Sequence, residues 1–241
     1  MRNKLLAFLK EQNMVQPGDT VICAVSGGAD SMALLWAMHS LKDKLEISVE
    51  AAHFNHNLRG EESNRDEAFV SDFCARHGIV CHIGGGSVKA GEKGLEAAAR
   101  TASYEFLQSL PGKISTAHTA DDNAETLLMH LIRGTGLKGL GGIAPKRENL
   151  IRPMLTVTRQ EVLAFLENQN IPFVTDSSNE TDAFLRNRIR HHVMPHLKQE
   201  NPSLAQNLSA TALRLRQDEE ALDAFAEPSA DVETLRKLPA S

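Results

Sequence analysis

Cysteine and large aromatic residues are scarce in this sequence of 241 residues. The three cysteines, Cys23, Cys74 and Cys81, are odd in number and form no CxxC pair, which argues against a disulfide framework or a zinc site. We expect them to pack as small apolar side chains. Trp36 and Tyr104 are the single residues of their kinds, so the sequence shows no aromatic platform of the type that stacks single-stranded nucleic acid.

Long hydrophobic runs are also missing. No stretch reaches about 18 uninterrupted apolar residues, and Met1–Lys10 lacks the apolar core of a signal peptide, so we predict a cytoplasmic protein without a membrane anchor. A hydrophobic content of 41% and a charged content of 24% exclude a disordered or fibrous chain. The length fits one α/β domain with a helical addition, or two small domains.

Positive charge is in the minority, because the formal net charge is −5. It is unevenly distributed, however, since residues 133–216 contain 12 Lys and Arg against 7 Asp and Glu. Such a basic region suits a polyanionic partner such as nucleic acid, although a charge cluster is more often solvated surface.

Short β-rich runs alternate with longer helical patterns in the first two thirds of the chain. The predicted strands are Thr20–Val25, Ile47–Phe54, Ile79–Ile83 and Ile114–Ala117, and the predicted helices are Ser31–Leu41, Glu62–His77, Leu95–Leu110 and Asp122–Ile132. Helices of this length can cross over a sheet, so we predict an α/β fold with a doubly wound parallel sheet at roughly residues 15–155. Ligands of such sheets bind at the carboxyl ends of the strands.

The last third reads as a smaller helical subdomain. Thr158–Asn168 is a predicted helix that Thr158 caps, and Asp182–Lys198 and Pro202–Phe225 are further predicted helices. Another amphipathic pattern begins at Asp231–Leu238 and stops at the end of the sequence. We therefore expect a first domain over residues 1–155, a helical subdomain over residues 156–241, and a truncation before a further C-terminal domain.

The most informative segment is a glycine-rich turn, Ser26-Gly27-Gly28-Ala29-Asp30-Ser31, between an apolar strand and a helix. Gly27 and Gly28 let backbone N–H groups approach an anion, the two serines add hydroxyl donors, and the helix N-terminus adds partial positive charge. Asp30 is unexpected beside an anion, but Mg²⁺ is commonly held between carboxylates and phosphate oxygens. The alternative is a tight turn with a serine N-cap, which needs no Asp30.

The turn lacks the GK[ST] ending of kinase-type P-loops and the GxGxxG pattern of dinucleotide folds. It resembles instead the SGGxDS loop of the PP-loop ATP pyrophosphatase superfamily. That resemblance implies a Rossmann-like fold in which the loop holds the pyrophosphate part of ATP and the reaction takes place at the α-phosphate, giving adenylation.

Four further stretches resemble the bacterial tRNA(Ile)-lysidine synthetases. They are His53–Arg59, Leu95–Arg100, His118–Thr126 with the following Arg133–Gly136, and Asp176–Asn179 with Phe184–His191. Each is weak alone, but their order along the chain is specific. The resemblance implies that ATP adenylates C2 of the wobble cytidine in the CAU anticodon of tRNA(Ile), and that free lysine then displaces AMP to give lysidine.

The resemblance also implies roles for the acidic residues and the loop. Asp30 and Asp122 are the expected Mg²⁺ ligands, although Asp122 could equally cap its helix. Glu125, one helical turn later, is expected to bind lysine or to accept its proton, against the alternative of an exposed first-turn Glu. The ATP-binding set comprises Ser26, Gly27, Gly28, Ala29, Asp30, Ser31, His53 and His118.

Arginines complete the expected site. Arg100 and Arg188 are implied to act near the cytidine and the α-phosphate, whereas Arg186 and Arg190 share one helical face that could follow the tRNA backbone. An ordinary surface salt bridge is the alternative for each of these arginines. The tRNA-binding set comprises His56, Arg59, Arg133, Arg186 and Arg190. His53, His56 and His118 lack further ligands at zinc-like spacing.

Two other functions stay open at this point. A PP-loop tRNA thiolase would need reactive thiols, and the absent CxxC pair makes it the weaker reading. A regulatory ATP-binding module would keep Ser26–Ser31 but would need neither Asp122 nor Arg188. The sequence also leaves open whether the chain forms a homodimer.

Overall fold

A single sheet organises the first two thirds of the chain. The computed structural model describes residues 1–57, 60–86, 95–175, 182 and 184–225. The strands are β1 Thr20–Ala24, β2 Ser48–Asn55, β3 Cys81–Gly85, β4 Lys113–Ser115, β5 Lys146–Arg147 and β6 Leu150–Ile151, in the order β3-β2-β1-β4-β6-β5. All neighbours are parallel except the β5–β6 hairpin. The predicted parallel sheet is confirmed, but the hairpin was not predicted.

Helices cover both faces of the sheet, as a doubly wound fold requires. They are α1 Arg2–Glu11, α2 Ala29–Leu45, α3 Glu61–Arg76, α4 Leu95–Ser109, α5 Ala120–Arg133, α6 Leu137–Leu140 and α7 Arg159–Gln169. Along β1, Val21 and Cys23 point to the core shared with α1, α2, α3 and α7, whereas Ile22 points to a smaller core with Leu107 of α4. This alternation is the period of two that a strand imposes.

The chain changes direction across the sheet at β1. From β1 it passes by way of α2 to β2 on one side, and it later returns to β4 on the other side of β1. The carboxyl ends of β1 and β4 therefore meet at a topological switch point, where open α/β sheets bind ligands. The glycine-rich turn and the N-terminus of α5 both follow these two strand ends.

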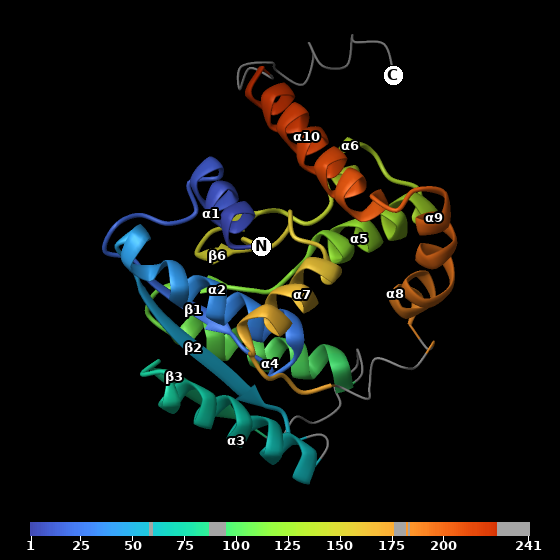
Figure 1. The fold of residues 1–241 in the computed structure, drawn as a ribbon. Helices are drawn as coiled ribbons and strands as arrows, with labels where there is room; N and C mark the ends of the chain where they lie inside the picture. The colour runs from blue at the N-terminus through green and yellow to red at the C-terminus, as the bar shows by residue number, and fades with distance from the viewer. Residues whose placement is uncertain (58–59, 87–94, 176–181, 183, 226–241) are drawn as a thin grey trace, which may run out of the picture.

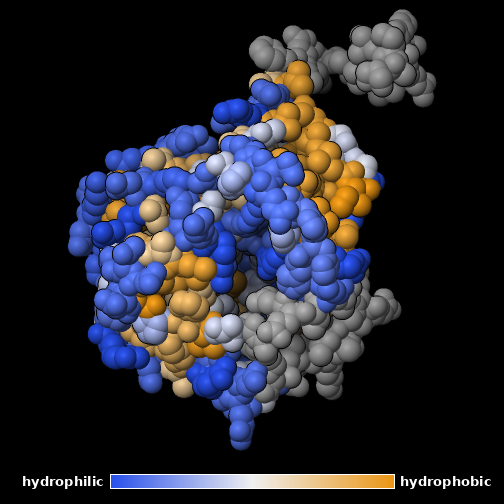
Figure 2. Space-filling view, turned by 45° about the vertical axis from the view of Figure 1, so that its right-hand side comes forward, coloured by the Kyte–Doolittle hydropathy of each residue, from blue (hydrophilic) through white to orange (hydrophobic). Residues whose placement is uncertain are grey.

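A helical unit stands beside the sheet (Figure 1). It contains α8 Leu185–Arg188, a π-helical turn Ile189–Val193, α9 Met194–Glu200 and α10 Leu204–Phe225. The helix α5 packs against this unit, because its Ala124 lies in a cluster with Ile189, Met194 and Ala205. The helix α7 instead packs in the main core with α2. On the outside of the unit, Leu131, Ile132 and Leu222 are exposed, and hydrophobic residues gather near the C-terminal end of the described chain (Figure 2).

The segment predicted as one helix over Asp182–Lys198 is helical over most of its length, but it is not a single regular α-helix. The helix begins at Leu185 and widens into the π turn, where the N–H of Met194 donates to Ile189 O. Pro195 explains the widening, because it has no N–H for the carbonyl of His191 and its ring would crowd that carbonyl in an α-helix.

The cysteines behave as small apolar residues, as expected. Cys23 and Cys74 are buried in the main core and Cys81 packs against it, and all three thiols are free. Among the described residues, no helix has the length and apolarity that a bilayer crossing demands.

Candidate active site

The glycine-rich turn places an uncapped helix N-terminus at the end of β1. The N-cap of α2 is Gly28, in an extended conformation, and no N-cap side chain accepts a hydrogen bond from the first turn of the helix. The serine N-cap of the alternative interpretation is therefore absent. Gly27 has φ +90°, a conformation that side chains other than glycine rarely adopt. The geometry suits an anion at the end of this 17-residue helix.

The two loop serines hold the turn together. The Ser31 hydroxyl donates to Gly28 O over 2.9 Å and lies 3.2 Å from the Ser26 hydroxyl, and the N–H of Gly28 donates to the Ser26 Oγ over 3.3 Å. The hydroxyl of Ser31 is thus engaged inside the turn, contrary to its expected use as a free donor to an anion. Val174 closes the loop from outside, because its N–H donates to Gly27 O over 2.9 Å.

A pocket of about 540 Å³ opens at this turn, within the usual range for small-molecule sites. Its wall contains five of the six loop residues, together with His56, His118 and Arg159. Gly27 is the loop residue outside this wall. Apolar side chains from β2 and α4, including Phe54 and Leu107, line another part of it. The pocket combines an apolar surface with one for anions, as a nucleotide requires.

The N-terminus of α5 is capped by its own acidic residue. The Asp122 Oδ2 accepts from the N–H of Thr119 over 2.9 Å, and the Thr119 Oγ1 accepts from the N–H of Asp122 over 3.3 Å. Asp122 therefore caps its own helix, which was the alternative to a metal-binding role for this residue. The second carboxylate oxygen, Oδ1, lies 3.1 Å from the Arg190 Nη2 and is turned toward the helical unit.

Glu125 and Arg190 form the most buried ion pair near the pocket. Arg190 donates twice to the Glu125 carboxylate, over 2.7 and 2.8 Å, and the side chain of Glu125 is 3% exposed. The Glu125 carboxylate raises the pKa of the Arg190 guanidinium, which stays charged. Glu125 and Asp122 share one guanidinium, so the prediction that they face the same way is confirmed, whereas the exposed alternative for Glu125 is wrong.

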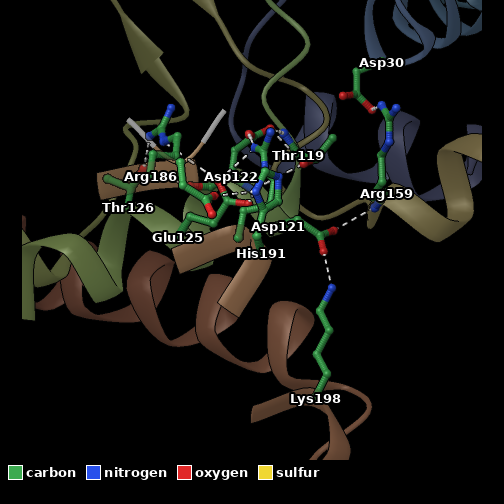
Figure 3. A network of polar contacts seen from close by, with 12 residues as sticks. Asp30, Thr119, Asp121, Asp122, Glu125, Thr126, Arg159, Arg186, His191 and Lys198 are labelled. Carbon is green, nitrogen blue, oxygen red and sulfur yellow. Dashed lines mark hydrogen bonds and ion pairs between the residues drawn. The ribbon is translucent and has the colours of Figure 1, made fainter. Parts of the chain in front are cut away.

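The structure places the arginines of residues 186–190 differently from the expectation, without testing their roles. Arg186 and Arg190 do lie on one side, but that side faces α5: Arg186 donates to the Thr126 Oγ1 over 2.7 Å and its Nε lies 3.8 Å from Glu125 (Figure 3). Arg188, which we expected in the site, is exposed and donates to Asp182 O over 3.0 Å. The π turn and the packing of Ile189 direct the two faces of this segment, which the sequence spacing alone did not fix.

An arginine that the sequence analysis missed reaches across the pocket. Arg159, the first residue of α7, forms an ion pair with Asp30 of α2, and its backbone N–H donates to the Asp121 Oδ2 over 2.7 Å. Lys198 of α9 binds the other oxygen of Asp121, also over 2.7 Å (Figure 3). The sequence predicted Thr158 as the N-cap of this helix, and that cap fixes the position of Arg159. The cap was therefore the sequence signal that could have pointed to Arg159.

The histidines have different surroundings. The Nδ1 of His53 donates to Val25 O over 2.8 Å, and His53 is buried beside the end of β1, so its expected contact with ATP gains no support here. His118 lines the pocket, and burial, together with the charges of Arg152, Arg186 and Arg100, lowers its pKa to about 4. His118 is therefore neutral at pH 7. Burial and the charge of His53 also lower the pKa of His56, which lines the pocket.

The remaining predicted residues lie at different distances from the pocket. Arg100 is exposed on α4 and stacks over Tyr104, with 5.7 Å from its Cζ to the ring centroid. Arg133 ends α5, eleven residues after Asp122, which is about 16 Å along the helix axis. Arg59 and the stretch Asp176–Asn179 lie outside the described residues.

The donor set at the pocket fits a cation bound together with phosphate. The charge of Asp122 acts on Asp30 across the site, and burial raises the pKa of the Asp30 carboxyl against the opposing effect of Arg159. Two carboxylates that interact beside a phosphate-type loop match the Mg²⁺ preference for one or two carboxylates plus phosphate oxygens. Among the described residues, no group of three or more His, Cys, Asp or Glu is arranged for a metal held by protein ligands alone.

Similarity to known proteins was found at three levels. A family model described as a PP-loop domain matches residues 1–197. Curated relatives include tRNA(Ile)-lysidine synthases of Bacteroides thetaiotaomicron, 38% identical over 224 residues, and of Geobacter sulfurreducens, 41% identical over 235 residues. These alignments cover 89% and 93% of this chain but 52% and 50% of the relatives, so the chain spans about half the length of the curated relatives it matches.

A solved structure, a U34-tRNA thiolase of Methanococcus maripaludis with a [4Fe-4S] cluster, superposes with a TM-score of 0.71 at 18% identity. The match covers 89% of this chain and 76% of that one, and it supports the fold alone. The match of the family model over most of the chain, together with the sheet order and the uncapped loop, leads to one conclusion: the chain belongs to the PP-loop domain family.

Proposed function

We propose that this chain is the catalytic part of an enzyme that uses ATP to join lysine to C2 of the wobble cytidine in the CAU anticodon of tRNA(Ile). One observation carries the proposal. An uncapped helix N-terminus and the carboxylate of Asp30 line one pocket, and Asp122 and the buried pair Glu125–Arg190 stand beside it at the switch point. The choice of tRNA(Ile) as the substrate rests on the names of the relatives, which are tRNA(Ile)-lysidine synthases.

In the first step, O2 of the cytidine attacks the α-phosphorus and the bond to pyrophosphate breaks. The N–H groups at the start of α2 would hold the departing pyrophosphate, because this helix terminus lines the pocket and has no side-chain cap. Mg²⁺, held by Asp30 and Asp122, would neutralise the phosphate charge as a Lewis acid. To reach it, each carboxylate would exchange a guanidinium partner for the ion.

Cations near the reacting groups would stabilise the charge on the phosphorus. Arg100 keeps its proposed place, since its charge acts on His118 in the pocket wall. Arg190 would act with Arg100, because it contacts Asp122 and Glu125 beside the pocket. Arg188 would have to leave Asp182 and turn toward the pocket to take its proposed role. For the tRNA we keep the full set proposed from the sequence: His56, Arg59, Arg133, Arg186 and Arg190.

In the second step, the amine of lysine attacks C2 and AMP leaves. Glu125 can pair with the ammonium group of lysine or take the proton that the amine must lose. The carboxylate already pairs with a guanidinium, which supports the proposal that it binds a cation on this side. Lysine would have to share Glu125 with Arg190 or displace it.

The test is a labelling reaction. The protein is incubated with ATP, Mg²⁺, labelled lysine and tRNA(Ile) bearing a CAU anticodon, and the label is expected in the RNA together with released pyrophosphate. Arg76→Gln, at the exposed C-terminal end of α3, is a matched control that should behave like the original protein. Pyrophosphate release without lysine incorporation would contradict lysidine formation, and no release with any tRNA would favour a regulatory module.

A tRNA thiolase is the less supported alternative. None of the three cysteines lines the pocket wall, and burial raises the pKa of the Cys23 thiol to about 12, so this thiol is not a nucleophile. Transfer of labelled sulfur to tRNA, without incorporation of lysine, would favour the thiolase over lysidine formation.

A further inference from the structure

Arg159 is held at its backbone by contacts that do not depend on its side chain. Thr158 caps α7, with Thr158 N–H donating to the Glu161 Oε2 over 2.9 Å and the Glu161 N–H donating to the Thr158 Oγ1 over 3.2 Å. The N–H of Arg159 itself donates to Asp121. The base of the side chain is therefore fixed against the N-terminus of α5, and replacing the side chain leaves these bonds in place.

The side chain of Arg159 lines the pocket and meets the phosphate loop at Asp30. It lines the same pocket as Ser26, Gly28 and Asp30, and it reaches Asp30 from α7 (Figure 3). The side chains of Arg159 and Asp30 are 45% and 33% exposed, so water and a ligand can reach the pair. A phosphate group bound at the loop would thus have both the N-terminus of α2 and a guanidinium within the same pocket.

The charges of the pocket explain how the pair could respond to a nucleotide. Asp30 is a carboxylate at a helix N-terminus that suits anions, and the guanidinium of Arg159 is its ion-pair partner. If Asp30 takes a metal ion when a nucleotide enters, Arg159 loses its partner while facing the phosphates. A guanidinium suits this exchange, because its planar fork binds carboxylate and phosphate oxygens alike in a bidentate manner.

We infer that Arg159 is a nucleotide-binding residue that contacts the β- and γ-phosphates of ATP and holds pyrophosphate as it leaves. The inference rests on the proposed use of ATP, but it needs neither tRNA nor lysine. Arg159 adds to the site a positive charge from α7. The arginines of α4 and α8 do not line the pocket wall.

Binding measurements with three ligands test it. Calorimetry in the presence of Mg²⁺ compares AMP, ATP and inorganic pyrophosphate for the original protein and for Arg159→Gln. We expect the dissociation constants of ATP and pyrophosphate to rise about 10- to 100-fold, as for lost hydrogen bonds to a charged group, and that of AMP to change less than about twofold. Arg159→Lys should recover part of the loss, because it restores the charge without the fork.

The outcomes separate the inference from the proposed function. Arg76→Gln serves as the control, and its affinities should equal those of the original protein. Equal losses for AMP and ATP in Arg159→Gln would indicate a structural role and overturn the inference, as would an unchanged affinity for ATP. If the original protein binds ATP with the expected dependence on Arg159 but incorporates no lysine, the inference holds and the proposed function fails.

Discussion

Replacing Arg190 by methionine should strongly destabilise the fold, because it would leave the Glu125 carboxylate buried without its main partner. Arg190 makes two bonds to Glu125 and one to Asp122, and the Glu125 side chain is 3% exposed. Breaking one side of a buried pair costs roughly 3–5 kcal/mol. Arg186, whose Nε lies 3.8 Å from Glu125, remains and compensates in part, so we expect about 3 kcal/mol at pH 7.

The assay is urea denaturation of Arg190→Met, Glu125→Gln and the double variant, with Arg214→Met on the exposed side of α10 as the control. Glu125→Gln removes the buried charge, so the double variant should be more stable than the sum of the single effects predicts, by at least about 1.5 kcal/mol. Additive effects within about 0.5 kcal/mol would refute the buried pair.

The pH dependence gives a second readout. Burial raises the pKa of the Glu125 carboxyl, and removing Arg190 removes the charge that opposes this rise. A carboxyl group whose folded pKa exceeds its unfolded value stabilises the fold when protonated, and that contribution is lost as the pH rises through the folded pKa. The stability difference between Arg190→Met and the original protein should therefore shrink on going from pH 7 to pH 5.

Three further predictions concern the pocket. Asp30→Ala should reduce tRNA-dependent pyrophosphate release by more than tenfold with an unchanged circular dichroism spectrum, and a smaller reduction would exclude a metal-binding role. Glu125→Gln should let adenylated tRNA accumulate because lysine attack fails, as chromatography of the RNA would reveal; normal turnover to product would count against lysine binding. Because the folded pKa of His118 is about 4 and its ordinary value is 6.5, the unfolded state binds the proton more tightly, so stability rises with pH between these values. The gain in unfolding free energy from pH 5 to pH 8 should be about 2 kcal/mol larger in the original protein than in His118→Asn, and equal gains would disprove the lowered pKa.

The basic region of residues 133–216 illustrates how a sequence pattern can have two uses. Its charge balance suggested a surface for nucleic acid, yet Arg159, Arg186, Arg190 and Lys198 contact Asp30, Glu125, Asp122 and Asp121 inside the described part of the chain. These positive charges therefore neutralise acidic residues in and beside the pocket. The exposed Arg133 and Lys138 stay available to a polyanion.

Local sequence determined the β1, β2 and β4 strand segments, the crossover helices, the glycine turn and the Thr158 cap, because each depends on residues within a few positions of one another. The parallel pairing followed from the crossover helices between the strands. It did not determine the partners of the charged side chains. Arg190 lies 65 residues from Glu125, and Arg159 is well over a hundred residues from Asp30. Only the docking of α7 on α2, and of the π turn on α5, brings these charges together. The reason is that partial burial removes water from the carboxylates, most of all from Glu125, and a guanidinium takes its place.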